Sequence, residues 1–265
     1  MDQQLLLIKT KNNICTLTLN RPEKKNSLSL ELVELLGSTL QEMAKDDDVR
    51  TVILRGAGDK AFCSGFDIGS LPTQSKADAD QRFKSLDQVE LLLQRLVSFP
   101  CPLIAMLNGF AFGLGCELAM CCDIRIGAQD IRMGMPPAKL GLVYPWAGLL
   151  RFIQSIGLQS TKEMFFTGRT YTGQRIKELG LVDYLVPGGE LEEFTYGMAE
   201  EIAGNAPLAL KGIKKVINLL MQSNRLDETQ TTEAQAIFKT ALFSKDMQEG
   251  QAAFLEKRKP RFKGK

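Results

Sequence analysis

Two segments place a glycine-containing turn between a short apolar strand and an expected helix. The first leads from Thr51–Leu54 into residues 61–68, and the second leads from Leu103–Leu107 into residues 108–117. The first amide groups of a helix have no partner within the helix, and the helix dipole adds partial positive charge there. Two such turns facing one point would stabilise negative charge on a carbonyl oxygen, as an oxyanion hole does.

An acidic residue follows the second turn. Glu117 lies in the expected first turn of the helix, where a carboxylate complements the helix dipole, and this alone would account for it. An acid in a closed apolar site can instead hold or transfer a proton, because its surroundings tune its pKa. Glu117 is therefore a candidate acid–base residue.

Other kinds of site are disfavoured by composition. The chain has no histidine, which excludes His-based triads, histidine general bases and most zinc sites, so we predict no metal centre. No secretion signal precedes the cysteines and no apolar stretch has the length of a membrane span, so we expect a cytoplasmic protein without membrane contact. In that compartment we expect reduced, buried thiols at Cys15, Cys63, Cys101, Cys116, Cys121 and Cys122.

The charges are nearly balanced. Lysine and arginine number 33 against 31 acidic residues, a net charge of +2 that gives a nucleic-acid partner no overall support. A basic cluster stands out at the C-terminus, and it has two interpretations, a solvated tail or a local site for a phosphate. Its members are Lys257, Arg258, Lys259, Arg261, Lys263 and Lys265.

The first half of the chain alternates strands and helices. Leu5–Thr10 and Ile14–Leu19 predict a hairpin, and Ser29 can cap a helix from about Leu30 to Lys45. A helix is expected from about Gln81 to Val97, after a polar surface segment at Leu71–Asp80.

The second half is mainly helical. Helices are expected after Thr172-Gly173 and at Glu190–Ala203, Pro207–Met221, Glu233–Leu242 and Lys245–Lys257. The pattern predicts an α/β core over residues 1–189 and a helical part over residues 190–265. Helices without a sheet to cover need another surface, which favours self-association.

The order of these motifs and their amino-acid sequences resemble those of the crotonase (enoyl-CoA hydratase/isomerase) superfamily. The resemblance implies a spiral of ββα units with a C-terminal helical trimerisation region, in trimers often paired into hexamers. It implies an acyl-CoA thioester as the substrate, with coenzyme A (CoA) entering as part of it and no separate cofactor. It rests on residues 20–28, 62–68, 108–119, Cys122-Asp123 and 254–260.

The same resemblance suggests which residues form the site. It assigns the oxyanion amides to Phe66 and Leu114, and it matches Glu117 to one of the two catalytic glutamates of the hydratases. Lys24, Phe254 and Lys257 match positions that contact the nucleotide end of CoA, where a compact ammonium suits a phosphate. Further substrate or CoA contacts are implied at Ser64, Asp67 and Ile68.

The sequence departs from the hydratases at their second glutamate. By alignment that position is Pro137, and proline cannot transfer a proton. Residues 135–144, 67–72 and 249–260 instead resemble a branch of the superfamily that decarboxylates methylmalonyl-CoA, in which a tyrosine at the position of Tyr144 lies near the substrate carboxylate. One departure remains, because that branch has histidine where this chain has Phe66.

Three interpretations stay open. The first is a decarboxylase of a malonyl-type CoA thioester that uses the two amides with Tyr144. The second is an enoyl-CoA hydratase or isomerase in which Glu117 acts alone. The third is a non-catalytic acyl-CoA binding protein that has kept the fold. Fold alone does not decide between them, because function resides in the site.

Overall fold

The computed structural model describes residues 4–67, 76–222 and 227–263. Contacts divide the chain into two compact units. Unit 1 comprises Met1–Met133 with Tyr171–Met221, and unit 2 comprises Gly134–Thr170 with Gln222–Lys265. The predicted boundary near residue 190 separates an α/β core from a helical region for self-association. Because the structure contains one chain, this boundary stays a prediction. Among the described residues, no helix combines the length and apolar character needed to cross a membrane.

Unit 1 is built on a six-stranded sheet in the order β1-β2-β3-β5-β7-β10. β1 (Leu6–Lys11) and β2 (Ile14–Leu19) form the predicted hairpin, and its two-residue turn places Asn12 and Asn13 at φ values of 51° and 64°. The other strands run parallel to β2 and to one another: β3 (Thr51–Gly56), β5 (Leu103–Leu107), β7 (Ile124–Ala128) and β10 (Tyr184–Val186).

A second sheet of four short strands positions the turns of interest. Its order is β4 (Ala61–Cys63), β6 (Phe110–Phe112), β8 (Arg132–Gly134) and β9 (Thr170–Thr172). β4 pairs in parallel with β6, which brings together the two segments that carry the glycine-containing turns.

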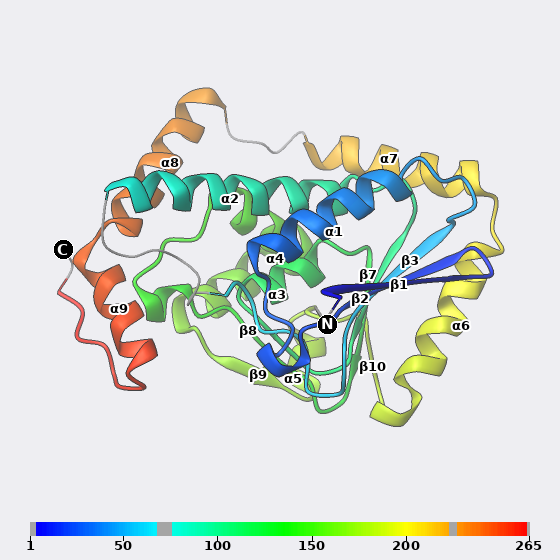
Figure 1. Ribbon diagram of the computed structural model, residues 1–265, viewed down its shortest axis with the longest axis horizontal. Coiled ribbons are helices and arrows are strands. Elements are labelled where there is room, and N and C mark those ends of the chain that lie inside the picture. Colours follow the sequence, from blue (N-terminus) through cyan, green and yellow to red (C-terminus); the bar gives the residue numbers. More distant parts are fainter. Residues whose placement is uncertain (1–3, 68–75, 223–226, 264–265) are drawn as a thin grey trace. The chain divides into compact units, whose positions relative to one another are not determined.

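Helices cover the larger sheet. α6 (Leu191–Ala203) contacts β2, β3, β5 and β7, while α1 (Leu30–Met43) and α2 (Lys76–Val97) run side by side (Figure 1). Ser29 caps α1 as predicted, because its side chain accepts a hydrogen bond from the amide of Leu32. The short helices α3 (Leu114–Met120) and α5 (Gln174–Glu178) each follow a strand of the second sheet.

Unit 2 contains the short 3₁₀ helix η3 (Pro137–Leu140), α4 (Trp146–Thr167), α8 (Glu228–Leu242) and α9 (Lys245–Leu255). α9 lies directly against η3, because a Cβ on Gly250 would overlap the backbone of Leu140. α4 is interrupted at Gly157, which has φ 78° and ψ 162°.

Three predicted helix boundaries were wrong. Residues 76–80, expected in a surface segment, form the start of α2, since the alanines at 77 and 79 favour helix; residues 71–75 of that segment lie outside the described part. α8 begins five residues early because Asp227 and Gln230 form a capping box. α9 ends at Leu255, because Lys257 adopts a φ of 54°.

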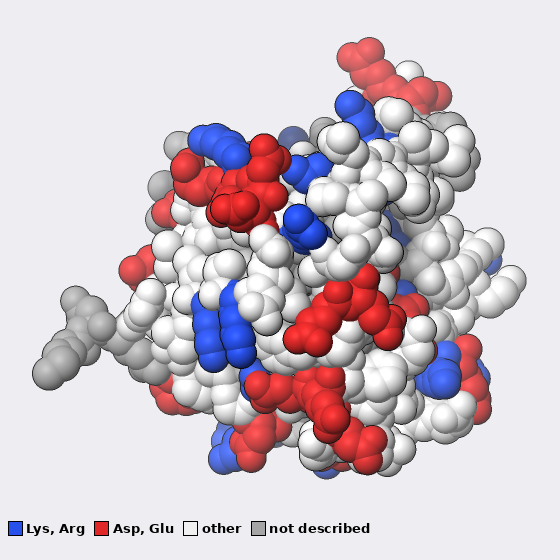
Figure 2. Space-filling model, turned by 90° about the vertical axis from the view of Figure 1, so that its right-hand side faces the viewer, with Lys and Arg blue, Asp and Glu red and all other residues white. Residues whose placement is uncertain are grey.

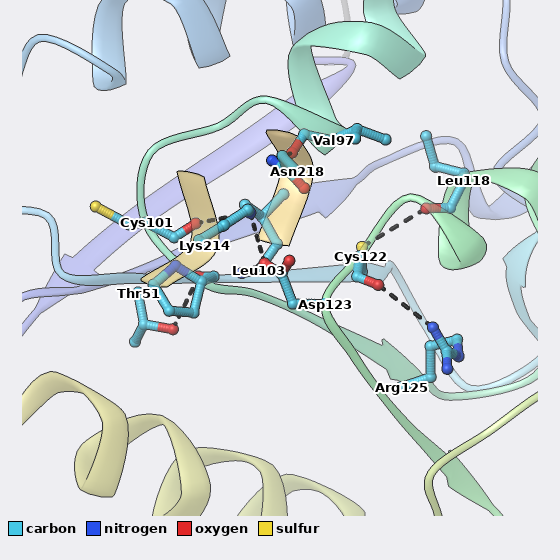
Figure 3. A network of polar contacts seen from close by, with 11 residues as sticks. Thr51, Val97, Cys101, Leu103, Leu118, Cys122, Asp123, Arg125, Lys214 and Asn218 are labelled. Carbon is cyan, nitrogen blue, oxygen red and sulfur yellow. Dashed lines mark hydrogen bonds and ion pairs between the residues drawn. The ribbon is translucent and has the colours of Figure 1, made fainter. Parts of the chain in front are cut away.

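α7 (Pro207–Gln222) packs on the rest of unit 1 through polar side chains. Lys214 Nζ donates to Asp123 Oδ2 at 2.6 Å and to the Cys101 carbonyl at 3.1 Å, and Asn218 donates to the Val97 carbonyl at 2.9 Å (Figure 3). Asp123 Oδ2 also accepts from the Leu103 amide at the start of β5. Many of the large apolar side chains of α7 are exposed: Leu208, Ile213, Val216, Ile217, Leu219, Leu220 and Met221.

Charged groups of both signs are spread across the face of the molecule shown in Figure 2. Acidic side chains gather in several clusters on this face, and basic side chains lie beside some of them. The arrangement agrees with the near balance of 33 basic and 31 acidic residues in the sequence.

Candidate active site

The first turn of the site follows β4. Leu28 pairs with Phe66 through a parallel bridge, in which the Leu28 amide donates to the Gly65 carbonyl at 2.9 Å and the Asp67 amide donates to the Leu28 carbonyl at 3.0 Å. Amides alternate in direction along extended backbone, so the N–H of Phe66 points away from Leu28. It is therefore not used by this bridge.

The second turn follows β6. Gly113 adopts φ 52° and ψ −124°, a conformation accessible to glycine, and α3 begins at Leu114. The Leu114 amide, at the first position of the helix, has no acceptor within α3. The turn therefore presents the positive end of a short helix.

The two turns lie against each other. Gly65 has a φ of 102°, and a Cβ built on it would stand 2.8 Å from the Phe112 carbonyl oxygen and 3.5 Å from the Leu114 nitrogen. A Cβ on Gly115 would overlap the carbonyl group of Cys63. Both glycines thus permit a close backbone approach, which brings the residue preceding Phe66 beside the Leu114 amide.

The loop before α1 supports the first turn from its other side. The Ser64 amide donates to the Lys25 carbonyl at 3.1 Å, and the Asn26 side chain donates to the carbonyls of Ala57 and Ala61 at 3.0 and 2.7 Å. Sequence reasoning missed this role of Asn26, which is fully buried and has a φ of 55°. Its place within the Asn20–Leu28 motif was the available signal.

Glu117 is buried in the first turn of α3. The residue is only 3% exposed, and its backbone amide donates a hydrogen bond to the Gly113 carbonyl at 3.1 Å. All seven residues of α3 are buried. The carboxyl group therefore lies in enclosed surroundings on the helix whose first amide is the candidate oxyanion donor.

Three predicted binding residues lie next to these turns, and one cannot be placed. Asp67 forms an ion pair with Arg21 at 3.2 Å, and Ser64 Oγ donates to the Lys24 carbonyl at 3.4 Å. Lys24 ends a short 3₁₀ helix and is exposed. Ile68 lies outside the described residues. The structure thus groups Lys24, Ser64 and Asp67 in one loop region.

The remaining predicted residues belong to unit 2. Tyr144 is half-buried, and its ring packs on Phe165 with a centroid separation of 5.3 Å. Pro137 is buried at the start of η3, whereas Lys139 is exposed and lays its aliphatic stem over Gly168. Phe254, 59% exposed, lies near the end of α9, and the exposed Lys257 follows it.

All six cysteines are buried thiols outside any disulfide bond. Burial raises the pKa of Cys63, beside the first turn, to about 12, and it does the same at Cys122. Thiols with such pKa values are not nucleophiles at neutral pH. Among the described residues, no group of three or more cysteine and acidic side chains is arranged to hold a metal ion.

The enoyl-CoA hydratase/isomerase family matches this chain over residues 9–265. The chain belongs to this family, the crotonase superfamily. It is an acyl-CoA enzyme of that superfamily, so the interpretation as a non-catalytic binding protein is not kept. The predicted α/β crotonase fold is confirmed, with two sheets and C-terminal helices.

Similar proteins of the family have different activities. The methylmalonyl-CoA decarboxylase of Escherichia coli is 32% identical over 265 residues, covering all of both chains. The short-chain-enoyl-CoA hydratase of Clostridium acetobutylicum is also 32% identical, over 98% of this chain and 97% of the hydratase. A solved methylmalonyl-CoA decarboxylase in complex with 2-nitronate-propionyl-CoA superimposes over the full length of both chains with a TM-score of 0.91 and 31% identity.

Proposed function

We propose that this enzyme decarboxylates a malonyl-type CoA thioester such as methylmalonyl-CoA. The bond between the α-carbon and the carboxylate breaks, carbon dioxide leaves, and the electron pair passes into the thioester as an enolate. The amides of Phe66 and Leu114 stabilise the enolate oxygen by hydrogen bonds. A proton then adds to the α-carbon and gives the saturated acyl-CoA. As written, the reaction needs no cofactor besides the CoA of the substrate.

The observation that carries this proposal is the pairing of two converging backbone turns with a single carboxylate. Gly65 lies against the Leu114 amide, and Glu117 is buried on the same helix. The position of the second hydratase glutamate is Pro137. Hydration requires one group to activate water and another to protonate the neighbouring carbon, whereas decarboxylation requires mainly that the enolate be stabilised.

Tyr144 has the role of orienting the substrate carboxylate through one hydrogen bond. Holding the carboxylate out of the thioester plane aligns the breaking bond with the carbonyl π system. Apolar surroundings further favour loss of its charge as carbon dioxide. The half-buried Tyr144 beside Phe165 suits this role, and the similarity to the decarboxylase supports it.

The nucleotide end of CoA is assigned to Lys24, Phe254 and Lys257. Both lysines are exposed, so their ammonium groups are available for phosphate oxygens, and the exposed ring of Phe254 can pack on the adenine. Ser64, Asp67 and Ile68 complete the proposed substrate contacts.

Self-association is the second part of the proposal. Several large apolar side chains of α7 are exposed, among them Leu208 at 86% and Leu220 at 68%. Surfaces of this kind are expected to be covered by another chain. We propose a homotrimer or homohexamer in the cytoplasm, where the six buried cysteines stay reduced. Leu220→Glu should lower the mass measured by light scattering, whereas Ile8→Glu on β1 should not.

A hydratase or isomerase reaction is the second candidate. It is favoured by the burial of Glu117 and by the similarity to the short-chain-enoyl-CoA hydratase. In this case Glu117 would act as both the base and the acid of the reaction.

Two substrates separate the candidates. Purified enzyme is offered methylmalonyl-CoA, with carbon dioxide release measured, and crotonyl-CoA, with loss of the enoyl absorbance measured. We expect decarboxylation. Rapid hydration without carbon dioxide release would contradict the first proposal.

Variants then test the roles of the side chains. Tyr144→Phe should lower decarboxylation about 10- to 100-fold, the loss expected for a hydrogen bond to a charged group. Tyr184→Phe is the matched control, because Tyr184 is exposed and packs on Phe194. Glu117→Gln should abolish any hydration, since Pro137 stands at the position of the second hydratase glutamate. Equal rates for Tyr144→Phe and the control would remove Tyr144 from the mechanism.

A further inference from the structure

The backbone after α9 holds Lys257 in a left-handed conformation, with a φ of 54°. The Arg258 amide donates to the Ala253 carbonyl at 2.9 Å, and the Lys257 amide donates to the Phe254 carbonyl at 3.3 Å. These two bonds form a Schellman motif, in which the residue at the position of Lys257 is usually glycine because a Cβ disfavours this conformation. A lysine here suggests that its side chain is needed for something other than folding.

Arg258, the next residue, binds the carboxylates of Glu249 and Glu256. Its guanidinium binds Glu249 through both Nη atoms, at 2.6 and 2.8 Å, and binds Glu256 through Nε at 2.5 Å. The Arg261 amide donates to Glu249 as well, at 2.7 Å. Paired Arg–carboxylate hydrogen bonds of this geometry are among the stronger polar contacts in proteins.

Lys257 itself stays without such a partner. Among the residues that the structure describes, no ion pair or side-chain hydrogen bond involves its ammonium, although Glu256 is its neighbour in sequence. Arg258 occupies the carboxylate that would otherwise attract it. A phosphate can therefore bind Lys257 without first displacing an acidic side chain.

We propose that Arg258 is a positioning residue for the phosphate-bearing end of CoA: by holding Glu249 and Glu256, it keeps Lys257 unpaired and directed outward from the end of α9. The Schellman turn sets the direction of Lys257, and the clamp keeps its charge available. The inference rests on the proposed function only in that the ligand is a CoA thioester, and it is independent of the reaction that follows.

Binding measurements with three probes test the clamp. Calorimetry gives the Kd of CoA, of 3′-dephospho-CoA and of pantetheine, which carries neither the 3′-phosphate nor the diphosphate. Arg258→Gln should raise the Kd of CoA about fivefold and leave that of pantetheine unchanged, because only the phosphate contact is affected. A similar loss for 3′-dephospho-CoA assigns Lys257 to the diphosphate, whereas no loss assigns it to the 3′-phosphate. Lys259→Gln, which removes a neighbouring cation outside the clamp, is the control and should change each Kd less than about twofold.

A triple variant distinguishes positioning from direct contact. Adding Glu249→Gln and Glu256→Gln to Arg258→Gln removes the competing carboxylates, so CoA affinity should return to within about twofold of the wild type. If the triple variant binds CoA as weakly as Arg258→Gln, Arg258 contacts the phosphate itself and the proposal is overturned. Equal weakening of pantetheine would show a general structural defect and would overturn it too.

Lys257→Gly supplies an independent readout. Glycine suits the left-handed backbone, so this variant should unfold at a higher urea concentration while binding CoA at least as weakly as Arg258→Gln. Unchanged CoA affinity would contradict the inference. Failure of methylmalonyl-CoA to react, with this binding pattern intact, would overturn the proposed reaction and leave the clamp standing.

Discussion

Two turns of this molecule share a local backbone and differ in their surroundings. After β6, Gly113 adopts φ 52° and ψ −124° before α3 begins, and after β9, Gly173 adopts φ 56° and ψ −143° before α5 begins. Neither glycine is aided by a side-chain cap, and a Cβ on either would meet no described atom within 4 Å. Locally, the two helix starts are equivalent.

Their surroundings separate them. All seven residues of α3 are buried, whereas Ile176 alone is buried in α5. Two residues after Gly113, Gly115 lets the backbone of Cys63 approach, and the corresponding residue after Gly173 is Arg175, which is exposed and pairs with Glu178 at 3.2 Å. A second backbone turn can therefore reach the start of α3. An amide at a helix start becomes an oxyanion donor only in the company of another donor and away from water.

The largest effect is expected from a substitution that moves the two turns of the candidate site apart. Gly65→Ala places a Cβ 2.8 Å from the Phe112 carbonyl, which displaces the Phe66 amide from the Leu114 amide. We expect kcat to fall about 10²- to 10³-fold, as for loss of one oxyanion donor. Steady-state kinetics on the preferred acyl-CoA substrate measures this. Gly173→Ala is the control and should keep its activity; a loss below threefold for Gly65→Ala would remove the amides from the mechanism.

The second prediction concerns the close approach at α3. Gly115→Ala forces a Cβ onto the Cys63 carbonyl group, so the free energy of unfolding should fall by about 2–3 kcal/mol. Urea titration gives the value. Arg175→Ala, at the equivalent place in α5, should change it by less than about 0.5 kcal/mol. Equal effects of the two substitutions would show that tertiary packing does not distinguish the helices.

The third prediction tests the local equivalence of the turns. Gly113→Ala and Gly173→Ala each place a Cβ on left-handed backbone with open space around it, so each should cost about 1 kcal/mol of stability. Parallel urea titrations compare them. A difference above about 0.5 kcal/mol would mean that the surroundings already act on the backbone of the turn itself.

The smallest effect on stability is expected from the ion pair between Arg258 and Glu249 at the end of α9. Hydrogen bonds from Arg258 and the Arg261 amide lower the pKa of Glu249 to about 2 from its ordinary 4.5. Because the pKa is lower in the folded state, the ion pair stabilises the protein above about pH 4.5, and its contribution is lost as the pH falls towards 2.

Urea titrations between pH 2 and 7 should therefore show a small deficit for Glu249→Gln above pH 4.5 that disappears near pH 2. The deficit of Gly115→Ala arises from packing and should not vary in this way. A Glu249→Gln deficit that is constant with pH would assign the effect to packing as well.

Much of the fold could be predicted because its signals are local. Apolar runs predicted the hairpin and the strands at Thr51 and Leu103, and Ser29 predicted the start of α1. Two of the three errors arose where hydrogen bonds at a helix end set its boundary: Asp227 starts α8 early, and the turn at Lys257 ends α9 before its sequence pattern does. These effects depend on individual hydrogen bonds, which periodicity does not report.

The candidate site was predictable only in part. The two turns and Glu117 were recognisable from motifs, but the supporting loop with Asn26 and the clamp formed by Arg258, Glu249 and Glu256 were not. Both join residues through side-chain contacts rather than through a repeating pattern. The roles of Phe66, Leu114, Glu117, Tyr144 and Lys257 remain predictions for the experiments above.

The sequence by itself determined the family, the α/β class and the two glycine-containing turns, because these follow from residue type and spacing along the chain. The tertiary structure showed which of the two helix starts a second backbone turn approaches. Gly113 and Gly173 are equivalent in conformation, yet only the first is followed by a residue small enough to let β4 approach and bring Gly65 to the Leu114 amide. Such an approach depends on the space between distant segments, which local sequence does not specify.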